Sequence, residues 1–223
     1  MRMTKYTHSC VRFDKPGTDG GRSTLVVDPG SFSEVEEALD GAQALLVTHE
    51  HPDHIDVVRA AAALESSASL EAWAPAKTAG QLTEAAPSAA SRIHVAEPDA
   101  EFEAAGFHIR TFGSQHALIH ASVPVVANIG YLVDSEAFHP GDSFTVPYGV
   151  AVPTLLVPIH APWSKVGEVL DYVIAVRPQR AYPIHNALLN DLGTGLVEGH
   201  AQRISGLYGT QFAHLAPRES VEL

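Results

Sequence analysis

Short apolar runs of strand length alternate along this chain with segments whose apolar positions recur at helical spacing. The run at residues 44–48 (ALLVT) is continuously apolar, which is typical of a strand buried on both faces. Residues 55–64 (IDVVRAAAAL) carry instead an apolar stripe that predicts a helix. By the same criteria, we expect strands at residues 23–28, 44–48, 71–74, 92–96, 102–104, 107–112, 128–133, 154–159, 181–184 and 211–215, and helices at residues 33–40, 55–64, 77–86, 165–176 and 194–207.

Turn and capping signals separate these elements. Ser33 and Glu36 have the spacing of a capping box, so we expect the helix at 33–40 to begin at Ser33. The segments between residues 102 and 133 are separated by glycines and predict an antiparallel meander. Strands and helices are interspersed, and no Pro-, Gly- or Ser-rich linker interrupts them. The sequence therefore predicts one α/β domain over residues 1–223.

Composition narrows the choice of partner and compartment. The 223 residues are 45% hydrophobic and include 26 Asp and Glu against 14 Lys and Arg, for a net charge of −12. This charge repels phosphate backbones, so nucleic acid and anionic membranes are poor partners. The lone Cys10 excludes a disulfide scaffold, and the chain has neither a signal-like N-terminus nor an apolar run of membrane-spanning length. We expect a cytoplasmic protein.

The chain contains 13 histidines, which is unusually many. Three of them and one aspartate form the most informative motif of the sequence. Residues 48–54 (THEHPDH) directly follow a predicted buried strand and precede a predicted helix. Alternate residues of extended chain share a face, so His49 and His51 can point the same way. Pro52 then forces a turn that brings Asp53 and His54 nearby. Three imidazoles and a carboxylate at this density are costly to bury unless cations satisfy them, and two transition-metal ions would do so.

This segment resembles the signature of the metallo-β-lactamase fold superfamily. Further segments match the same family, namely Asp28-Pro29, Gly113-x-x-His116, His139-Pro140-Gly141-Asp142-Ser143 and Pro183-Ile184-His185. Together with His8, they are most similar to the ascorbate-6-phosphate lactonase-like metal-dependent hydrolases. The resemblance covers essentially the whole chain. It implies a four-layer αββα sandwich, in which two mixed β-sheets carry helices on their outer faces.

The resemblance also implies a set of metal ligands. His49, His51 and His116 would hold one ion, and Asp53, His54 and His185 a second, with Asp142 bridging the two. Such a site leaves positions open for a bridging hydroxide and for substrate, as catalytic metal sites require. Asp53 would also orient the attacking water or accept its proton, so it is the predicted catalytic residue. Imidazole with carboxylate suits zinc, manganese or iron, and we expect zinc first.

Other residues near these motifs receive weaker assignments. His120 is an alternative ligand to His116, and His139 is expected to be structural or to contact a ligand from outside. In the resembling subgroup, loops that carry His8 and His160 face the site, so these two could contact substrate or hydrogen-bond to a ligand. Trp163 and Lys165 could line the pocket, with helix capping and packing as equal alternatives. Asp28 is expected to tie the turn beneath the metal loop, whereas His94, His108, His200 and His214 are expected to be ordinary surface or paired histidines.

The expected function is hydrolysis of a small ester, lactone or phosphoester by a hydroxide bridging two metal ions. A nuclease or phosphodiesterase of the same fold is the runner-up, although the acidic chain lacks a basic nucleic-acid-gripping segment. A mono-iron sulfur dioxygenase would keep the H-x-H-x-D-H motif and is a second alternative, and a non-catalytic binding module is a third. Two divalent ions would make the pocket locally positive, so the acidic total does not exclude a small anionic substrate. A homo-oligomer is compatible with the sequence.

Overall fold

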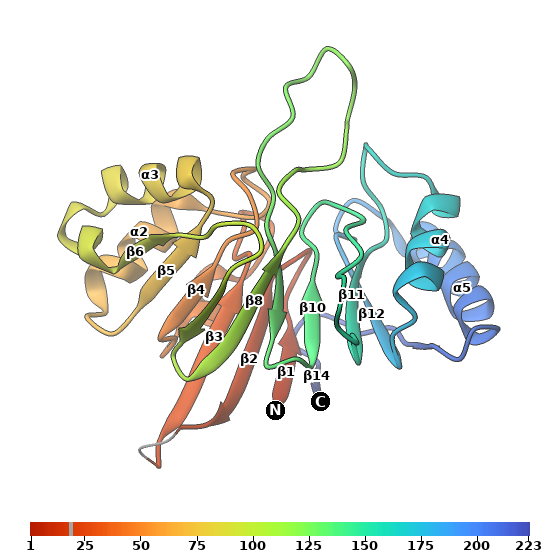
Figure 1. The fold of residues 1–223 in the computed structure, drawn as a ribbon, viewed down its shortest axis with the longest axis horizontal. Helices are drawn as coiled ribbons and strands as arrows, with labels where there is room; N and C mark the ends of the chain where they lie inside the picture. Colours follow the sequence, from red (N-terminus) through yellow and green to blue (C-terminus); the bar gives the residue numbers. More distant parts are fainter. Residues whose placement is uncertain (18–19) are drawn as a thin grey trace.

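The computed structural model, which describes residues 1–17 and 20–223, contains two mixed β-sheets of seven strands each (Figure 1). The first sheet has the order β14-β1-β2-β3-β4-β5-β6 and the second the order β13-β12-β11-β10-β9-β8-β7. The strands of the first sheet are β1 (Arg2–Lys5), β2 (Val11–Pro16), β3 (Arg22–Val27), β4 (Ala44–Leu46), β5 (Glu71–Ala74), β6 (Ile93–Val95) and β14 (Ser220–Glu222). Those of the second are β7 (Glu101–Ala104), β8 (Phe107–Phe112), β9 (Gly130–Val133), β10 (Ala137–His139), β11 (Thr154–Pro158), β12 (Arg180–Ile184) and β13 (Gln211–Phe212).

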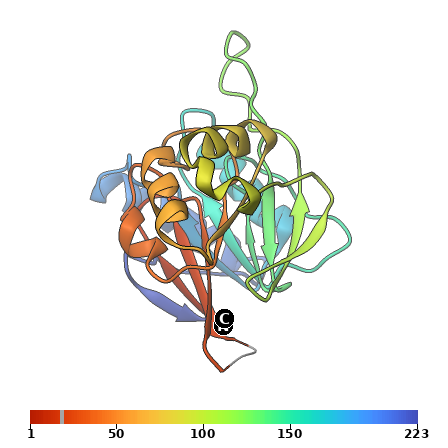
Figure 2. The same ribbon diagram turned by 90° about the vertical axis from the view of Figure 1, so that its left-hand side faces the viewer.

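Helices cover the outer face of each sheet, which gives the four-layer αββα sandwich. In Figure 1, α2 and α3 lie beside the first sheet and α4 and α5 beside the second; turned by 90° in Figure 2, the helices of the first sheet stand in front of the strands. The helical elements are α1 (Val35–Leu39), α2 (Val57–Ser66), α3 (Ala76–Ala85), the 3₁₀ turn η1 (Pro87–Arg92), α4 (Val166–Val176) and α5 (Asp191–Gly206). The predicted fold class is confirmed.

Burial on both faces explains the continuous apolar strands. In β4, Ala44 and Leu46 pack into the core between the two sheets, whereas Leu45 packs against the helices. Successive side chains of a strand point to opposite faces, so a strand buried on both sides must be apolar at every position. The same alternation places Leu156 between the sheets and Val157 against α4 and α5.

Several element boundaries differ from those expected. The capping box predicted at Ser33 and Glu36 is wrong, because the Ser33 hydroxyl donates to the Gly30 carbonyl and α1 begins at Val35 after Glu34. The strand expected to start at residue 128 begins at Gly130, and the one expected to end at residue 215 ends at Phe212. The meander is confirmed, because β7, β8, β9 and β10 pair antiparallel in sequence order. Four strands were not anticipated, namely β1, β2, β10 and β14.

Parallel pairing sets the position of the polar loops. Strands β3 to β6 run parallel in one sheet, and β10 to β13 run parallel in the other. The carboxyl ends of parallel strands meet at one edge of their sheet, so the loops after β3, β4, β11 and β12 gather at a common edge of the sandwich. The loop between β8 and β9 protrudes beyond the rest of the ribbon in both views (Figures 1 and 2). Among residues 1–17 and 20–223, none of the helices has the length and apolar character that a bilayer span requires.

Gly30 lets two of these loops touch. A Cβ at Gly30 would lie 1.9 Å from the Asp53 carbonyl oxygen, and the neighbouring Ser31 N–H donates to the Pro52 carbonyl. The turn after β3 therefore forms the floor on which the loop after β4 rests, and only glycine leaves room for that contact.

We predict that Gly30→Ala lowers the free energy of unfolding by about 2 to 4 kcal/mol, because the backbone of Asp53 must move to admit the methyl group. Chemical denaturation of the metal-stripped protein measures this change. Gly80→Ala is the control, because Gly80 lies within α3 with open space around it, and this variant should be neutral or up to about 1 kcal/mol more stable. Equal stability of the two variants would contradict the close approach at Gly30.

Candidate metal centre

The seven predicted ligands come together at the loop-bearing edge of the sandwich. Two neighbouring groups of residues offer ligand atoms that lie, within each group, no more than 4.8 Å apart. One group comprises His49, His51, His116 and Asp142, and the other comprises His8, Asp53, His54 and His185. The division agrees with the one that the family resemblance implied, except that His8 joins the second group and Asp142, expected to bridge the two, falls in the first. Whether these residues bind metal stays a prediction.

A buried hydrogen-bond network orients the loop that carries the H-x-H-x-D-H motif. The Asp28 carboxylate accepts from the Thr48 N–H at 2.7 Å, from the Thr48 hydroxyl at 2.6 Å and from His54 Nδ1 at 2.6 Å. The Thr48 hydroxyl, already donating to Asp28, accepts from His49 Nδ1 at 3.0 Å. Both imidazoles therefore carry their proton on Nδ1 when neutral, which leaves each Nε2 lone pair for the centre.

Two further histidines are oriented by backbone carbonyls in the same way. His116 Nδ1 donates to the Ala117 carbonyl at 2.5 Å, and His185 Nδ1 donates to the His160 carbonyl at 2.6 Å. The base of the protruding loop is closed by the His116 N–H, which donates to the Val126 carbonyl. His185 has a positive φ of 57°, and its N–H donates to the His8 carbonyl. Four ligand rings thus have their Nδ1 hydrogen bonded elsewhere; Nε2 of His49 lies 3.1 Å from His51 Nδ1, and Nε2 of the other three has no hydrogen-bond partner.

Several polar atoms of this network have no hydrogen-bond partner, and a bound cation could interact with them. The buried Nε2 atoms of His54, His116 and His185, together with Asp142 Oδ1, have no hydrogen-bond partner. Each Nε2 lies 3.0 to 3.3 Å from an Asp142 oxygen, but none of these contacts has hydrogen-bond geometry. Unpaired polar atoms buried this deeply are costly, and imidazole nitrogens with carboxylate oxygens are the donor set of zinc and manganese. The residues present therefore fit a pair of divalent ions.

Asp142 is held in place from two sides. Its N–H donates to Asn128 Oδ1 at 3.0 Å, and its Oδ2 accepts from the Trp163 indole N–H at 2.9 Å. Burial by itself would raise the pKa of Asp142, but the surrounding His54, His116 and His185 hold it well below its usual range. Asp142 is therefore an ionised carboxylate that lies between the two groups, as a bridging ligand must.

The same charges act on the histidines. Burial lowers the pKa of His54 and His185, but the carboxylates beside them outweigh it and raise the pKa of His54 well above 6.5 and that of His185 to about 9. Burial lowers the pKa of His49, whose nearest neighbours are other histidines. In the metal-free chain, protons on His54 and His185 therefore supply the positive charge that the carboxylates demand, and metal binding would release them.

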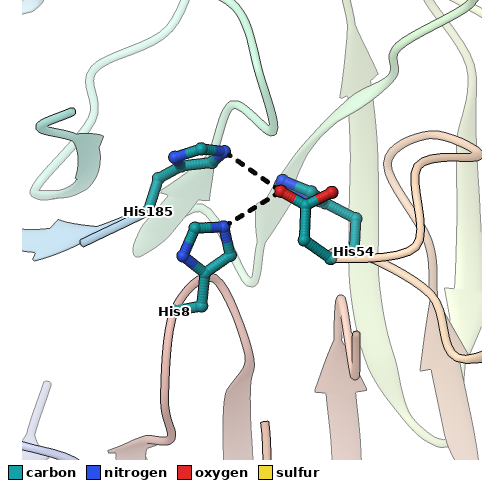
Figure 3. A group of neighbouring side chains, drawn as sticks. His8, His54 and His185 are labelled. Carbon is teal, nitrogen blue, oxygen red and sulfur yellow. Dashed lines mark hydrogen bonds and ion pairs between the residues drawn. The ribbon is translucent and has the colours of Figure 1, made fainter. Parts of the chain in front are cut away.

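His8 contacts a predicted ligand rather than the open pocket. Burial lowers the pKa of His8 to about 4, so its ring is neutral near pH 7. Its Nδ1 accepts from the Ala187 N–H at 3.3 Å, so Nε2 carries the proton and donates to Asp53 Oδ2 at 3.2 Å. In Figure 3 the rings of His8 and His185 point toward the same position beside His54. This tautomer makes His8 a hydrogen-bond donor to Asp53.

The other histidines and the lysine considered as site residues lie outside the two groups of predicted ligands. His120 is exposed and bonds to Ser122, so it lies outside both groups. His139 is fully buried and donates from Nε2 to the Ser9 carbonyl. His160 contributes its backbone carbonyl to His185, and Lys165 precedes α4 as its N-cap. Asn128 was missed, because it was expected inside a strand, and so was the orienting role of Thr48.

Comparisons with known proteins agree with this architecture. The family model described as a β-lactamase superfamily domain matches residues 2–185. Protein Rv0786c of Mycobacterium tuberculosis is 40% identical over 225 residues, which cover 99% of this chain and 98% of that protein. The metallo hydrolase Igni18 of Ignicoccus hospitalis superposes with a TM-score of 0.68 at 18% identity, covering 99% of this chain and 97% of its own. The metallo-β-lactamase fold protein YhfI of Bacillus subtilis superposes with a TM-score of 0.71 at 15% identity, and the match covers 97% of this chain and 92% of that protein.

We predict that the chelator-stripped protein binds about two zinc or manganese ions per chain, one for each group of ligands. His116→Ala and His185→Ala should each remove about one ion, and Asp142→Ala should weaken both sites. Elemental analysis and calorimetric titration measure the stoichiometry. His120→Ala is the matched control and should still bind two ions. Loss of an ion in His120→Ala but not in His116→Ala would reverse the assignment.

Asp28→Asn should both destabilise the fold and weaken metal binding, because an amide NH₂ would face donors that now meet a carboxylate. We expect a loss of about 2 to 4 kcal/mol in unfolding free energy and a decrease of about 10- to 100-fold in metal affinity. Denaturation and metal titration of the same variant measure the two effects. Asp40→Asn, at an exposed residue, is the control. Wild-type metal affinity in Asp28→Asn would show that this network does not orient the ligands.

Proposed function

Because the chain belongs to the β-lactamase superfamily, we propose that it is a metal-dependent hydrolase that uses two divalent ions to cleave a small ester, lactone or phosphoester. The observation that carries the proposal is the convergence of five histidines and two carboxylates at one edge of the sandwich, with buried nitrogens that have no partner. The predicted ligands His51, Asp53, His116, Asp142 and His185 line a pocket there, whose volume is about 320 Å³. A substrate can therefore reach the centre directly.

Each ligand has a proposed place in the reaction. His49, His51 and His116 would hold one ion, and Asp53, His54 and His185 the other, with Asp142 available to both. When bound, the two ions supply Lewis acidity that lowers the pKa of a water molecule and polarises the bond to be cleaved. We expect zinc, and manganese or iron suit the same donors.

Asp53 is the proposed catalytic carboxylate. Its side chain is 24% exposed and borders the pocket, whereas the predicted bridging carboxylate, Asp142, is nearly buried. Burial would raise the pKa of Asp53, but His185 and His8 hold it far below its usual range. A carboxylate of such low pKa stays ionised and retains a proton poorly, which suits it to orienting a water molecule better than to holding its proton. Asp53 therefore orients the attacking water and passes its proton on to solvent.

His8 and Trp163 support the two carboxylates in this scheme. His8 donates to Asp53 on the side away from the pocket, and Trp163 donates to Asp142 at its rim. Each donor holds one oxygen of its carboxylate, so the two donors fix the carboxylate planes before substrate arrives. The closer assignment to the ascorbate-6-phosphate lactonase-like subgroup is part of this proposal.

We predict that the metal-loaded protein turns over at least one compound of a panel of lactones, carboxylic esters, thioesters and phosphodiesters. A chelator should abolish turnover and added metal should restore it. Asp53→Asn, assayed at saturating metal, should lower kcat by about 10² to 10⁴. His200→Ala, at an exposed histidine on α5, is the control.

Different outcomes of the same panel separate the alternatives. Turnover of phosphodiesters alone, with nucleic acid as the better substrate, would favour the nuclease. Turnover that requires dioxygen and a persulfide would overturn hydrolysis in favour of a sulfur dioxygenase. If the purified protein held no metal and Asp142→Ala changed none of its measured properties, the non-catalytic binding module would be favoured.

A further inference from the structure

The pocket above the predicted metal centre has an apolar wall. Besides the five predicted ligands and Ser31, its lining consists of the apolar residues Phe32, Pro52, Ile119, Pro162, Trp163 and Leu188. These side chains come from the loops that follow β3, β4, β8, β11 and β12. Five separate loops therefore bring apolar side chains to one small opening.

Three of these apolar residues are substantially exposed to solvent. Phe32 is 45% exposed, Ile119 is 39% exposed and Leu188 is 56% exposed. Scattered single apolar residues are ordinary on a protein surface, but a cluster around a concave site marks ligand binding. Trp163 adds its ring face, because its only donor, the indole N–H, is already bonded to Asp142.

The same pocket lacks basic side chains that could bind an anionic group of a substrate. Among its lining residues, all of which the structure describes, there is no lysine or arginine. The exposed Lys165, at the N-cap of α4, is not among the lining residues, and three other basic side chains are paired elsewhere. Lys77 pairs with Glu50, Arg218 pairs with Glu37, and the buried Lys5 donates to the Tyr6 carbonyl and to Asn186. Enzymes that recognise phosphate or carboxylate groups place such donors around them.

We propose that the substrate is a neutral carboxylic ester or lactone whose apolar acyl or aryl group lies against Phe32, Ile119 and Leu188. The inference rests on the proposed hydrolase function and narrows it by removing anionic and phosphoryl substrates. Water adds to the carbonyl carbon, the bond from that carbon to the alkoxy oxygen breaks, and the alcohol leaves with one proton from the water. The volume of about 320 Å³ fits a small molecule.

A matched set of p-nitrophenyl esters tests the apolar wall. From acetate to hexanoate, kcat/KM of the metal-loaded protein should rise about tenfold or more, because added methylenes leave water. The p-nitrophenyl monoester of adipate has the same chain length with a terminal carboxylate, and its kcat/KM should be at least about tenfold below that of hexanoate. A preference for the adipate ester would overturn the proposal.

Variants at Leu188 locate the effect. Leu188→Ala should reduce the hexanoate-to-acetate ratio about threefold or more, and Leu188→Lys should raise the adipate-to-hexanoate ratio by a similar factor. Leu192→Ala is the matched control, because Leu192 is 85% exposed and lies outside the pocket. Unchanged ratios in both Leu188 variants would contradict contact between this wall and the substrate.

A binding measurement separates this inference from the proposed function. In a Trp73→Phe background, hexanamide should change Trp163 fluorescence at about tenfold lower concentration than adipic acid monoamide, whether or not any ester is cleaved. Hydrolysis confined to phosphodiesters would leave the hydrolase function standing and overturn the neutral substrate. Preferential binding of hexanamide without hydrolysis of any panel compound would overturn the hydrolase function alone. Equal binding of the two amides would overturn the apolar recognition.

Discussion

The centre depends on one buried carboxylate, Asp28. It lies at the end of β3 with a positive φ of 52° and no exposure to solvent, and it accepts three hydrogen bonds of 2.6 to 2.7 Å. A charge buried this deeply is tolerated only if its donors stay in place, so Asp28 ties the end of β4, through Thr48, and His54 to the end of β3. The same bonds fix which nitrogen of His49 and His54 carries the proton. One residue that touches no substrate thereby sets the orientation of two proposed ligands.

The fold brings together groups that repel one another or are costly to bury without a cation. The centroids of the His49 ring and the His54 ring lie 4.0 Å apart, and those of the His8 and His185 rings are also 4.0 Å apart. The sandwich holds these rings because each is also bonded from behind, by Thr48, Asp28, the Ala187 N–H or the His160 carbonyl. Packing of the two sheets and their helices stabilises the folded state enough to offset the cost of burying these groups close together. Metal ions would then stabilise the folded state further, because they bind ligands that only the folded chain assembles.

The elements that could be predicted from sequence are those buried on both sides or marked by strong turn signals. Strands Glu71–Ala74 and Phe107–Phe112 have the predicted bounds, and the histidine loop follows a strand and precedes a helix as expected. The strand at Arg2–Lys5 (RMTK) was missed because Met3 is its one apolar residue and its second buried position is a lysine, so these four residues carry no alternating apolar signal. Ser33 was misassigned because its hydroxyl bonds within the preceding turn instead of capping the helix. The proposed ligands could be named from spacing, but Asn128 and the tautomer of His8 depend on contacts between distant segments, which no local pattern encodes.

The proposed ligands and the apolar residues of the pocket are held by different kinds of structure, and this difference helps to indicate which residues select the substrate. The proposed ligands are held by strand ends and by hydrogen bonds to buried groups, so their arrangement is rigid. Phe32, Ile119 and Leu188 lie on loops with their side chains partly in solvent, where substitutions cost the fold little. The net charge of −12 belongs to the rest of the surface, because no exposed carboxylate other than Asp53 lines the pocket. Overall charge therefore says little about the substrate, and the neutral loop residues beside the ligands are the better guide to it.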